Sequence, residues 1–124
     1  MFNPHQKLVY VAGPLSADTE YQKTLNVRFA ERVAQELWRM DFSVICPHKN
    51  TEHFDGCVMK EDWEVWLRGD LKQISRCDGV VMLPSWEKSK GAVVEHNFAK
   101  ERGIPVFYWL TDKEELEMWS DMIG

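Results

Sequence analysis

Apolar residues along the chain group into short continuous runs, which alternate with longer stretches of mixed polarity. The runs are rich in β-branched and aromatic residues and end close to a glycine or a proline, which is typical of buried strands. They predict strands at 7–13, 42–47, 79–84 and 105–110. The chain therefore begins with a strand and returns to a strand after each stretch of mixed polarity.

The intervening stretches have helical periodicity, because their apolar residues recur every three or four positions. The stretch from Glu20 to Met40 shows this with Leu25, Phe29, Val33, Leu37 and Met40. A second stripe, over about 60–76, has Trp63, Trp66, Leu67, Leu71 and Ile74. We expect a third helix at 91–102, ended by Gly103, and a last helix over 111–123 with Thr111 or Asp112 as its N-cap.

Strands that alternate with helices form parallel sheets with right-handed crossovers. We therefore expect an α/β protein in which residues 1–124 form a single three-layer domain, flavodoxin-like or Rossmann-like. The parallel sheet would have four or five strands in the order 2-1-3-4. Ligands bind such sheets beyond the carboxyl ends of the strands, where the order reverses. Here that point lies between the loops "AGPLSADTEY" and "PSWEKSKG".

Composition and charge narrow the classes of partner. The chain has 124 residues, 44% of them hydrophobic, which is enough for one core, and its net charge of −5 argues against binding of a nucleic acid polymer. A single nucleotide held by a few local donors stays compatible with that charge. No apolar run is long enough to cross a membrane, and the start of the chain does not read as a signal peptide. We expect a cytoplasmic protein with reduced cysteines.

The histidines and cysteines do not predict a metal site. Their spacing matches no standard ligand pattern, so we expect neither a metal nor another cofactor. There is no G-x-S-x-G motif for a serine nucleophile, and no Walker A or G-x-G-x-x-G motif. The four histidines are His5, His48, His53 and His96.

Two carboxylates stand out because they fall among apolar residues. Asp70 lies on the apolar stripe of the second helix, where an unpaired carboxylate would be costly, so it must be paired, hydrogen-bonded or facing a cavity. Glu95 is expected in the first turn of the third helix, on the inward face with Ala92 and Phe98. Two acids that converge on one cleft are the arrangement that breaks glycosidic bonds. The structural alternatives are a buried Asp70 that caps a loop and a Glu95 that favours a helix start.

The loop before the third helix has features that suit a phosphate. Ser89 lies near the N-cap, where backbone N–H groups are free, and Gly91 allows a ligand to approach the backbone. The structural alternative is that Ser89 is an ordinary helix cap. Asp78, by contrast, reads as a turn or strand-start residue.

Three segments in order carry a resemblance to a known family. "VYVAGPLS", "GDLKQISRCDGVVMLP" and "SKGAVVEHNFAKERGIPVF" together resemble the nucleoside 2-deoxyribosyltransferase-like superfamily over about residues 8–108. The chain is most similar to small phage and bacterial members. The superfamily also contains deoxynucleoside 5′-monophosphate N-glycosidases.

The resemblance implies roles for particular residues. The family's G-x-x-x-E pattern matches Gly91 to Glu95, which makes Glu95 the nucleophile, and its D-L pair matches Asp70, the second acid. The aromatic residue of the first strand and the glycine after it match Tyr10 and Gly13.

Six residues before the nucleophile, the transferases carry an Asp for the sugar 5′-hydroxyl. The monophosphate hydrolases carry there a Ser for the 5′-phosphate. Ser89 at this position favours a nucleotide substrate. The first loop lacks the family's Arg- and Gly-rich phosphate segment, so Ser16, Lys88 or Lys90 would have to replace it.

The expected function is cleavage or transfer of the N-glycosidic bond of a 2′-deoxynucleoside 5′-monophosphate. The partners expected are this small-molecule nucleotide and further copies of the chain, in a homo-oligomer of two or more. Two alternatives stay open: a nucleotide-binding sensor without turnover, and a flavodoxin-like regulatory domain whose acids pair with basic residues. The sequence leaves open which base is recognised and whether water or a second base accepts the sugar.

Overall fold

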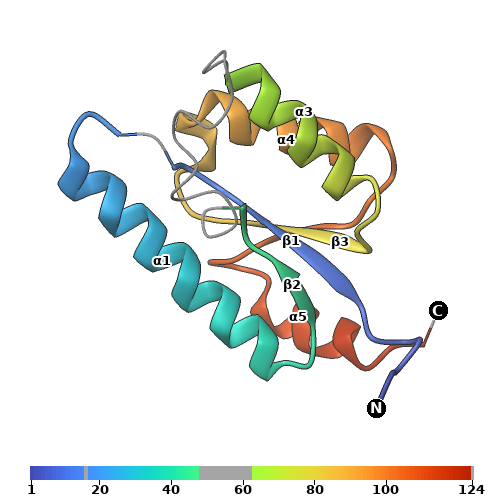
Figure 1. The fold of residues 1–124 in the computed structure, drawn as a ribbon. Helices are drawn as coiled ribbons and strands as arrows, with labels where there is room; N and C mark the ends of the chain where they lie inside the picture. Colours follow the sequence, from blue (N-terminus) through green and yellow to red (C-terminus); the bar gives the residue numbers. More distant parts are fainter. Residues whose placement is uncertain (16, 48–62, 124) are drawn as a thin grey trace.

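The computed structural model describes residues 1–15, 17–47 and 63–123. Its four strands within these ranges form one parallel sheet in the order β2-β1-β3-β4, as the sequence predicted. The elements in chain order are β1 (Leu8–Ala12), α1 (Glu20–Arg39), β2 (Ser43–Ile45), α3 (Trp63–Ile74), β3 (Gly79–Met82), the 3₁₀ helix η1 (Trp86–Lys88), α4 (Lys90–Glu101), β4 (Val106–Tyr108) and α5 (Lys113–Ser120). The described part of the chain thus has an α/β fold with helices on both faces of the sheet (Figure 1).

The two faces of the sheet bury two separate clusters of side chains. Successive residues of a strand point to opposite faces, so β1 contributes Val9 and Val11 to one cluster and Tyr10 and Ala12 to the other. The first cluster packs under α1 and α5, and the second under α3 and α4 (Figure 1). Tyr10, Val9 and Val11 are all fully buried.

The helices follow the expected periodicity, with a shift in the buried face of α1. Its buried residues are Ala30, Val33, Ala34 and Leu37, which leaves Phe29 37% exposed beside them. Thr19 caps this helix by accepting a hydrogen bond from the Gln22 N–H at 3.1 Å.

The end of α4 explains the need for Gly103. This residue has φ +72°, a left-handed conformation that glycine adopts without strain. The Ile104 N–H donates to the Ala99 carbonyl at 2.9 Å and the Gly103 N–H to the Lys100 carbonyl at 3.2 Å, which together form a Schellman motif. The chain can then turn directly into β4.

None of the helices in the described ranges has the length and apolar character needed to cross a membrane.

Candidate functional site

Tyr10 and Glu95 meet on the face of the sheet that α3 and α4 cover. Tyr10 is in the middle of β1, and its hydroxyl donates a hydrogen bond of 2.6 Å to Glu95 Oε2. Glu95 lies on the buried face of α4 with Ala92 and Ala99, and only 6% of it is exposed. The bond joins residues 85 positions apart in the sequence, so the sheet and the helix position the two groups together.

The position of Glu95 in its helix corrects one expectation. The sequence suggested the first turn, where an acid is stabilised by the helix dipole. The helix begins at Lys90, so Glu95 lies in its second turn, and the first turn contains no acid. Because the dipole effect falls off beyond the first turn, helix stability does not account for this carboxylate.

Asp70 is the third member of this cluster. It comes from α3, is half-buried, and interacts electrostatically with both Tyr10 and Glu95. Burial and the two neighbouring acids raise the pKa of the Tyr10 phenol far above its usual value, so this hydroxyl acts as a donor throughout the physiological range.

Burial also raises the pKa of both acids. It raises the pKa of Glu95 to about 8, with the charge of Asp70 acting in the same direction and the Tyr10 hydrogen bond against it. Burial raises the pKa of Asp70 to about 6. The charge of Asp70 disfavours ionisation of Glu95, whereas the hydrogen bond with Glu95 lowers the pKa of Asp70, so the pair retains one proton between these two pKa values.

In the described part of the chain, basic residues do not neutralise the two acids. No lysine, arginine or histidine in residues 1–15, 17–47 and 63–123 forms an ion pair with Asp70 or Glu95, so in this part of the chain they are not a structural salt bridge. The same residues contain no group of three or more His, Cys, Asp or Glu side chains that could hold a metal ion. The described residues therefore supply two acids and a phenol to the cluster.

Gly13 has a packing reason that the sequence did not reveal. A Cβ atom at this position would lie 2.6 Å from the Cβ of Leu83, the residue after β3, so the ends of β1 and β3 approach as closely as they do only because of the glycine. Ser16, the other candidate of the first loop, lies outside the described residues.

The N-terminus of α4, with its cap residue Ser89, precedes Glu95 along the same helix. Ser89 is its N-cap, and the Ser89 hydroxyl oxygen accepts a hydrogen bond from the Ala92 N–H at 3.2 Å. The hydrogen of that hydroxyl stays available for donation. A Cβ atom at Gly91 would meet no described residue within 4 Å, so packing among the described residues does not require this glycine.

Lysines surround this helix start. Lys88 precedes the cap and Lys90 follows it, although cations at a helix N-terminus oppose the helix dipole. The Lys90 ammonium lies 4.7 Å from the centroid of the Trp63 ring, the first residue of α3, and has no ion-pair partner in the described part of the chain. The start of α4 thus has two lysines close to its cap, with Glu87 as the nearest acid before them in the sequence.

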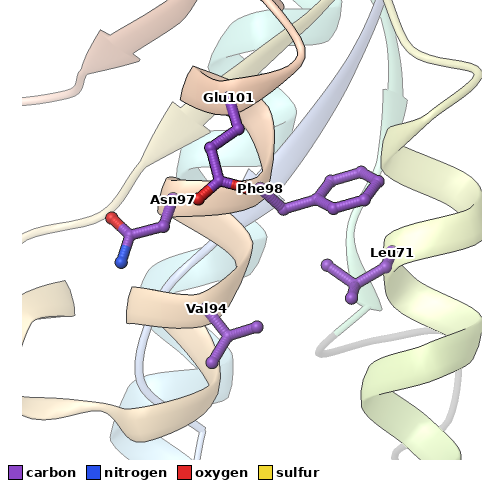
Figure 2. Close-up of a pocket in the computed structure, with 5 residues that line it drawn as sticks. All are labelled: Leu71, Val94, Asn97, Phe98 and Glu101. Carbon is purple, nitrogen blue, oxygen red and sulfur yellow. The ribbon is translucent and has the colours of Figure 1, made fainter.

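A shallow pocket lies between α3 and α4, but it is separate from the acids. It is lined by Leu71, Val94, Asn97, Phe98 and Glu101. The Phe98 ring, from α4, and the Leu71 side chain, from α3, point toward each other across it (Figure 2). Its residues are neighbours of Asp70 and Glu95 in sequence but lie on other faces of the two helices. The pocket therefore adds no group to the Tyr10–Asp70–Glu95 cluster.

Comparisons with known proteins give a family and a fold. The model of a family described as "Domain of unknown function (DUF4406)" matches residues 7–108. A solved structure of a 2-deoxyribosyltransferase from the psychrotolerant bacterium Bacillus psychrosaccharolyticus has a TM-score of 0.58 with 20% sequence identity, over 82% of this chain and 70% of that chain. No curated protein matches the sequence. At this identity the structural match establishes that the two proteins share a fold.

Proposed function

The chain belongs to the family described as a domain of unknown function, DUF4406, and we propose that it is an enzyme acting on the N-glycosidic bond of 2′-deoxynucleoside 5′-monophosphates. The observation that carries this proposal is the cluster of Tyr10, Glu95 and Asp70, in which a buried and a half-buried acid have raised pKa values and no basic partner among the described residues. Buried acids of this kind are costly to a fold and are typical of active sites.

The first step is a displacement at the sugar. The Tyr10 hydroxyl donates its hydrogen bond to Glu95 Oε2, so we assign the attack on C1′ to the other carboxylate oxygen, Oε1. The Oε1–C1′ bond forms as the bond from C1′ to the base nitrogen breaks, through an oxocarbenium-like transition state. Asp70 gives its proton to the departing base, so the base leaves neutral.

The second step releases the sugar. An acceptor, either water or a second base, attacks C1′ from the vacated side, and the Glu95–C1′ bond breaks. The proton of the acceptor returns to Asp70. Two displacements restore the original configuration at C1′, as in retaining glycosidases.

The shared proton suits this sequence of events. A proton that moves from Glu95 to Asp70 ionises the nucleophile and makes the general acid available in a single transfer. The pair needs one proton for the first step, and one proton is what it binds around neutral pH.

The start of α4 supports a phosphate on the substrate. Its free N–H groups, the hydroxyl of Ser89 and the ammonium of Lys90 together favour an anion, and the described residues leave space over Gly91. Anions gain from the positive end of a helix, and no acid of the first turn competes for it.

Replacement of Ser89 tests this assignment. Ser89→Asp keeps a residue that caps the helix well but places a negative charge where the phosphate would bind. We expect the kcat/KM for monophosphates to fall about tenfold to a hundredfold, the size of a lost hydrogen bond to a charged group, while that for free nucleosides is retained or rises. Ser89→Gly separates the two effects, because it loses the hydroxyl but adds no charge and weakens the cap by only a few tenths of a kcal/mol; its loss of kcat/KM for monophosphates should be smaller than that of Ser89→Asp.

The proposal as a whole is tested by incubating the full chain with the four 2′-deoxynucleosides and their 5′-monophosphates and measuring free base. We expect release from at least one monophosphate at a higher kcat/KM than from its nucleoside. Binding of monophosphates without any release would indicate a nucleotide-binding protein without turnover. Equal release from both substrate classes would remove the phosphate from the proposal and leave the glycosidic chemistry.

A further inference from the structure

Three aromatic side chains from three different elements form a stacked cluster beside the site. The Trp86 ring, from η1, stacks on the imidazole of His96, from α4, with centroids 4.1 Å apart and planes 21° apart. Tyr108, the last residue of β4, completes the cluster, with its ring 5.9 Å from His96 and 6.2 Å from Trp86. The cluster contains none of the groups that the proposed reaction uses.

Hydrogen bonds fix the imidazole in this stack. His96 Nε2 lies 2.7 Å from the Tyr108 hydroxyl, and Nδ1 lies 3.1 Å from Asn97 Oδ1. Because a carbonyl oxygen can only accept, Nδ1 carries the hydrogen, and in the neutral imidazole Nε2 then accepts from the Tyr108 hydroxyl. The ring is thus held at both nitrogens and on one face.

The backbone hydrogen bonds of the loop that Trp86 anchors are local in the described part of the chain. They run from the Trp86 N–H to the Leu83 carbonyl at 3.3 Å, from the Lys88 N–H to the Ser85 carbonyl at 3.1 Å and from the Ser89 N–H to the Trp86 carbonyl at 3.0 Å. The Trp86 side chain packs on the cluster under α3 and α4. Ser85 has φ +68°, a conformation that costs a non-glycine residue energy and persists only where the surroundings enforce it. The stack of Trp86 on His96 is an attachment of this kind, and the loop leads directly into the cap residue Ser89.

We propose that His96 is a positioning residue, which through Trp86 and Tyr108 holds residues 84–89 against β4 and so presents Ser89 to the substrate's phosphate. The holding of the loop stands on the contacts just described. The presentation of Ser89 rests on the proposed function. His96 follows Glu95 in the sequence but projects about 100° away from it around α4 and contacts Trp86 and Tyr108 instead of Tyr10, so its effect on the reaction passes through the loop.

Two single variants and their combination test this role in the full chain. His96→Phe keeps a ring that can stack on Trp86 but removes both nitrogens, and Tyr108→Phe removes only the hydroxyl. We expect each to speed amide hydrogen exchange in residues 84–92 about three- to tenfold, the size of one lost hydrogen bond. The double variant should exchange no faster than the singles, because both remove the same bond. Exchange is measured by mass spectrometry, with α5 as the internal reference.

Kinetics then test the link to the substrate. Both variants should raise KM for the monophosphate about three- to tenfold, while kcat and the KM for the matching nucleoside stay within about twofold. Phe107→Leu is the matched control: it alters the neighbouring residue of β4, whose ring packs on Trp119 at 4.8 Å on the opposite face of the sheet. It should lower the melting temperature but change neither the exchange of 84–92 nor the monophosphate KM.

The two readouts separate the possible failures. Exchange of 84–92 that stays at the wild-type rate in both single variants would overturn the positioning role. Faster exchange with an unchanged monophosphate KM would overturn the presentation of Ser89. If wild-type protein released no base from any nucleotide, the proposed function would fail, and the exchange measurement would still decide whether His96 holds the loop.

Discussion

The two faces of the sheet bury side chains of different character, although one strand serves both. Under α1 and α5 the buried cluster consists of apolar residues such as Val9 and Leu37, and the buried Lys7 beside it places its ammonium 5.3 Å from the centroid of the Trp119 ring. Under α3 and α4 the same strand contributes Tyr10, and the layer above it contains Glu95 and Asp70. Folding alone would favour apolar residues on both faces, so the polar face carries groups that stability does not explain.

The helices on the two faces also differ in the charges of their first turns. The first turn of α1 contains Glu20 and that of α5 contains Glu114 and Glu115, as helix dipoles favour. The first turn of α4 has no acid and is flanked by Lys88 and Lys90. The face that contains Glu95 and Asp70 is thus also the face covered by α4, whose first turn lacks acids and suits an anion.

The largest effect is expected for Asp70→Asn. Removal of the general acid should lower kcat by about 10² to 10⁴. Stability should stay level or rise, because the variant removes a carboxylate that repels Glu95. Turnover and melting temperature are measured together, with one substrate whose base leaves poorly and one whose base leaves readily.

The readily leaving base should recover much of the lost rate, since it needs little protonation. A large drop in melting temperature, with equal losses on both substrates, would instead make Asp70 a structural residue and leave Glu95 without its partner.

Leu37→Ala should show the converse behaviour on the apolar face. Leu37 is a fully buried residue of α1, and its truncation should lower the free energy of unfolding by about 2–5 kcal/mol. Activity per folded molecule should be unchanged, because no group of the site is touched. Urea unfolding measures the loss of stability, and a titration of active protein measures the activity per folded molecule. An activity that falls by more than the folded fraction does would show that the two faces are coupled.

The next largest effect is expected in the pH dependence of the free energy of unfolding, to which the acids on the α3 and α4 face contribute. The folded-state pKa values of Glu95, about 8 against 4.5, and Asp70, about 6 against 3.8, are raised. Their contribution is fully present below about pH 4 and is lost as the pH rises toward 8, because the unfolded chain releases protons that the folded chain retains. Glu95→Gln should make this decline shallower, by roughly 1–3 kcal/mol at pH 8.

Glu36→Gln is the control for that measurement. Glu36 is an exposed acid of α1, 3.8 Å from Lys113, and its loss should leave the slope unchanged. Chemical denaturation between pH 4 and 9 gives the comparison. Identical slopes for wild type and Glu95→Gln would show that Glu95 is not a buried acid with a raised pKa.

The smallest effect is expected for Tyr10→Phe. The variant removes the hydrogen bond to Glu95 Oε2 and keeps the buried ring. The pKa of Glu95 should rise further, since that bond lowers it, and kcat at neutral pH should fall about tenfold. The upper limb of the pH–rate profile should move to higher pH, and an unmoved limb would indicate that Tyr10 only fills space.

The sheet and its order could be predicted because the four apolar runs are short, end at Gly or Pro, and alternate with helical periods. The inward direction of Glu95 also followed from its spacing to Ala92 and Ala99. The exposure of Phe29 did not follow, because apolar spacing does not tell which side of a stripe faces the sheet.

Long-range partners could not be read from the sequence. The contact of Tyr10 with Glu95 and that of His96 with Tyr108 depend on how helices sit on the sheet, which local patterns do not specify. The clash that Leu83 would make with a side chain at position 13 likewise arises only when β1 and β3 are paired. For His96 the sequence offered only a metal-ligand hypothesis to reject, and a neighbouring Glu is no signal for a stacked ring.

The account depends most directly on Glu95 as the nucleophile. The measurement is base release from 2′-deoxynucleoside 5′-monophosphates by wild type and by Glu95→Gln, with binding of the same nucleotides followed by calorimetry and the intact mass of the wild-type protein recorded during turnover. We predict release and a covalent sugar-phosphate adduct for wild type, and for Glu95→Gln no release above the uncatalysed rate with binding retained. Turnover by Glu95→Gln within a few-fold of wild type would contradict the account.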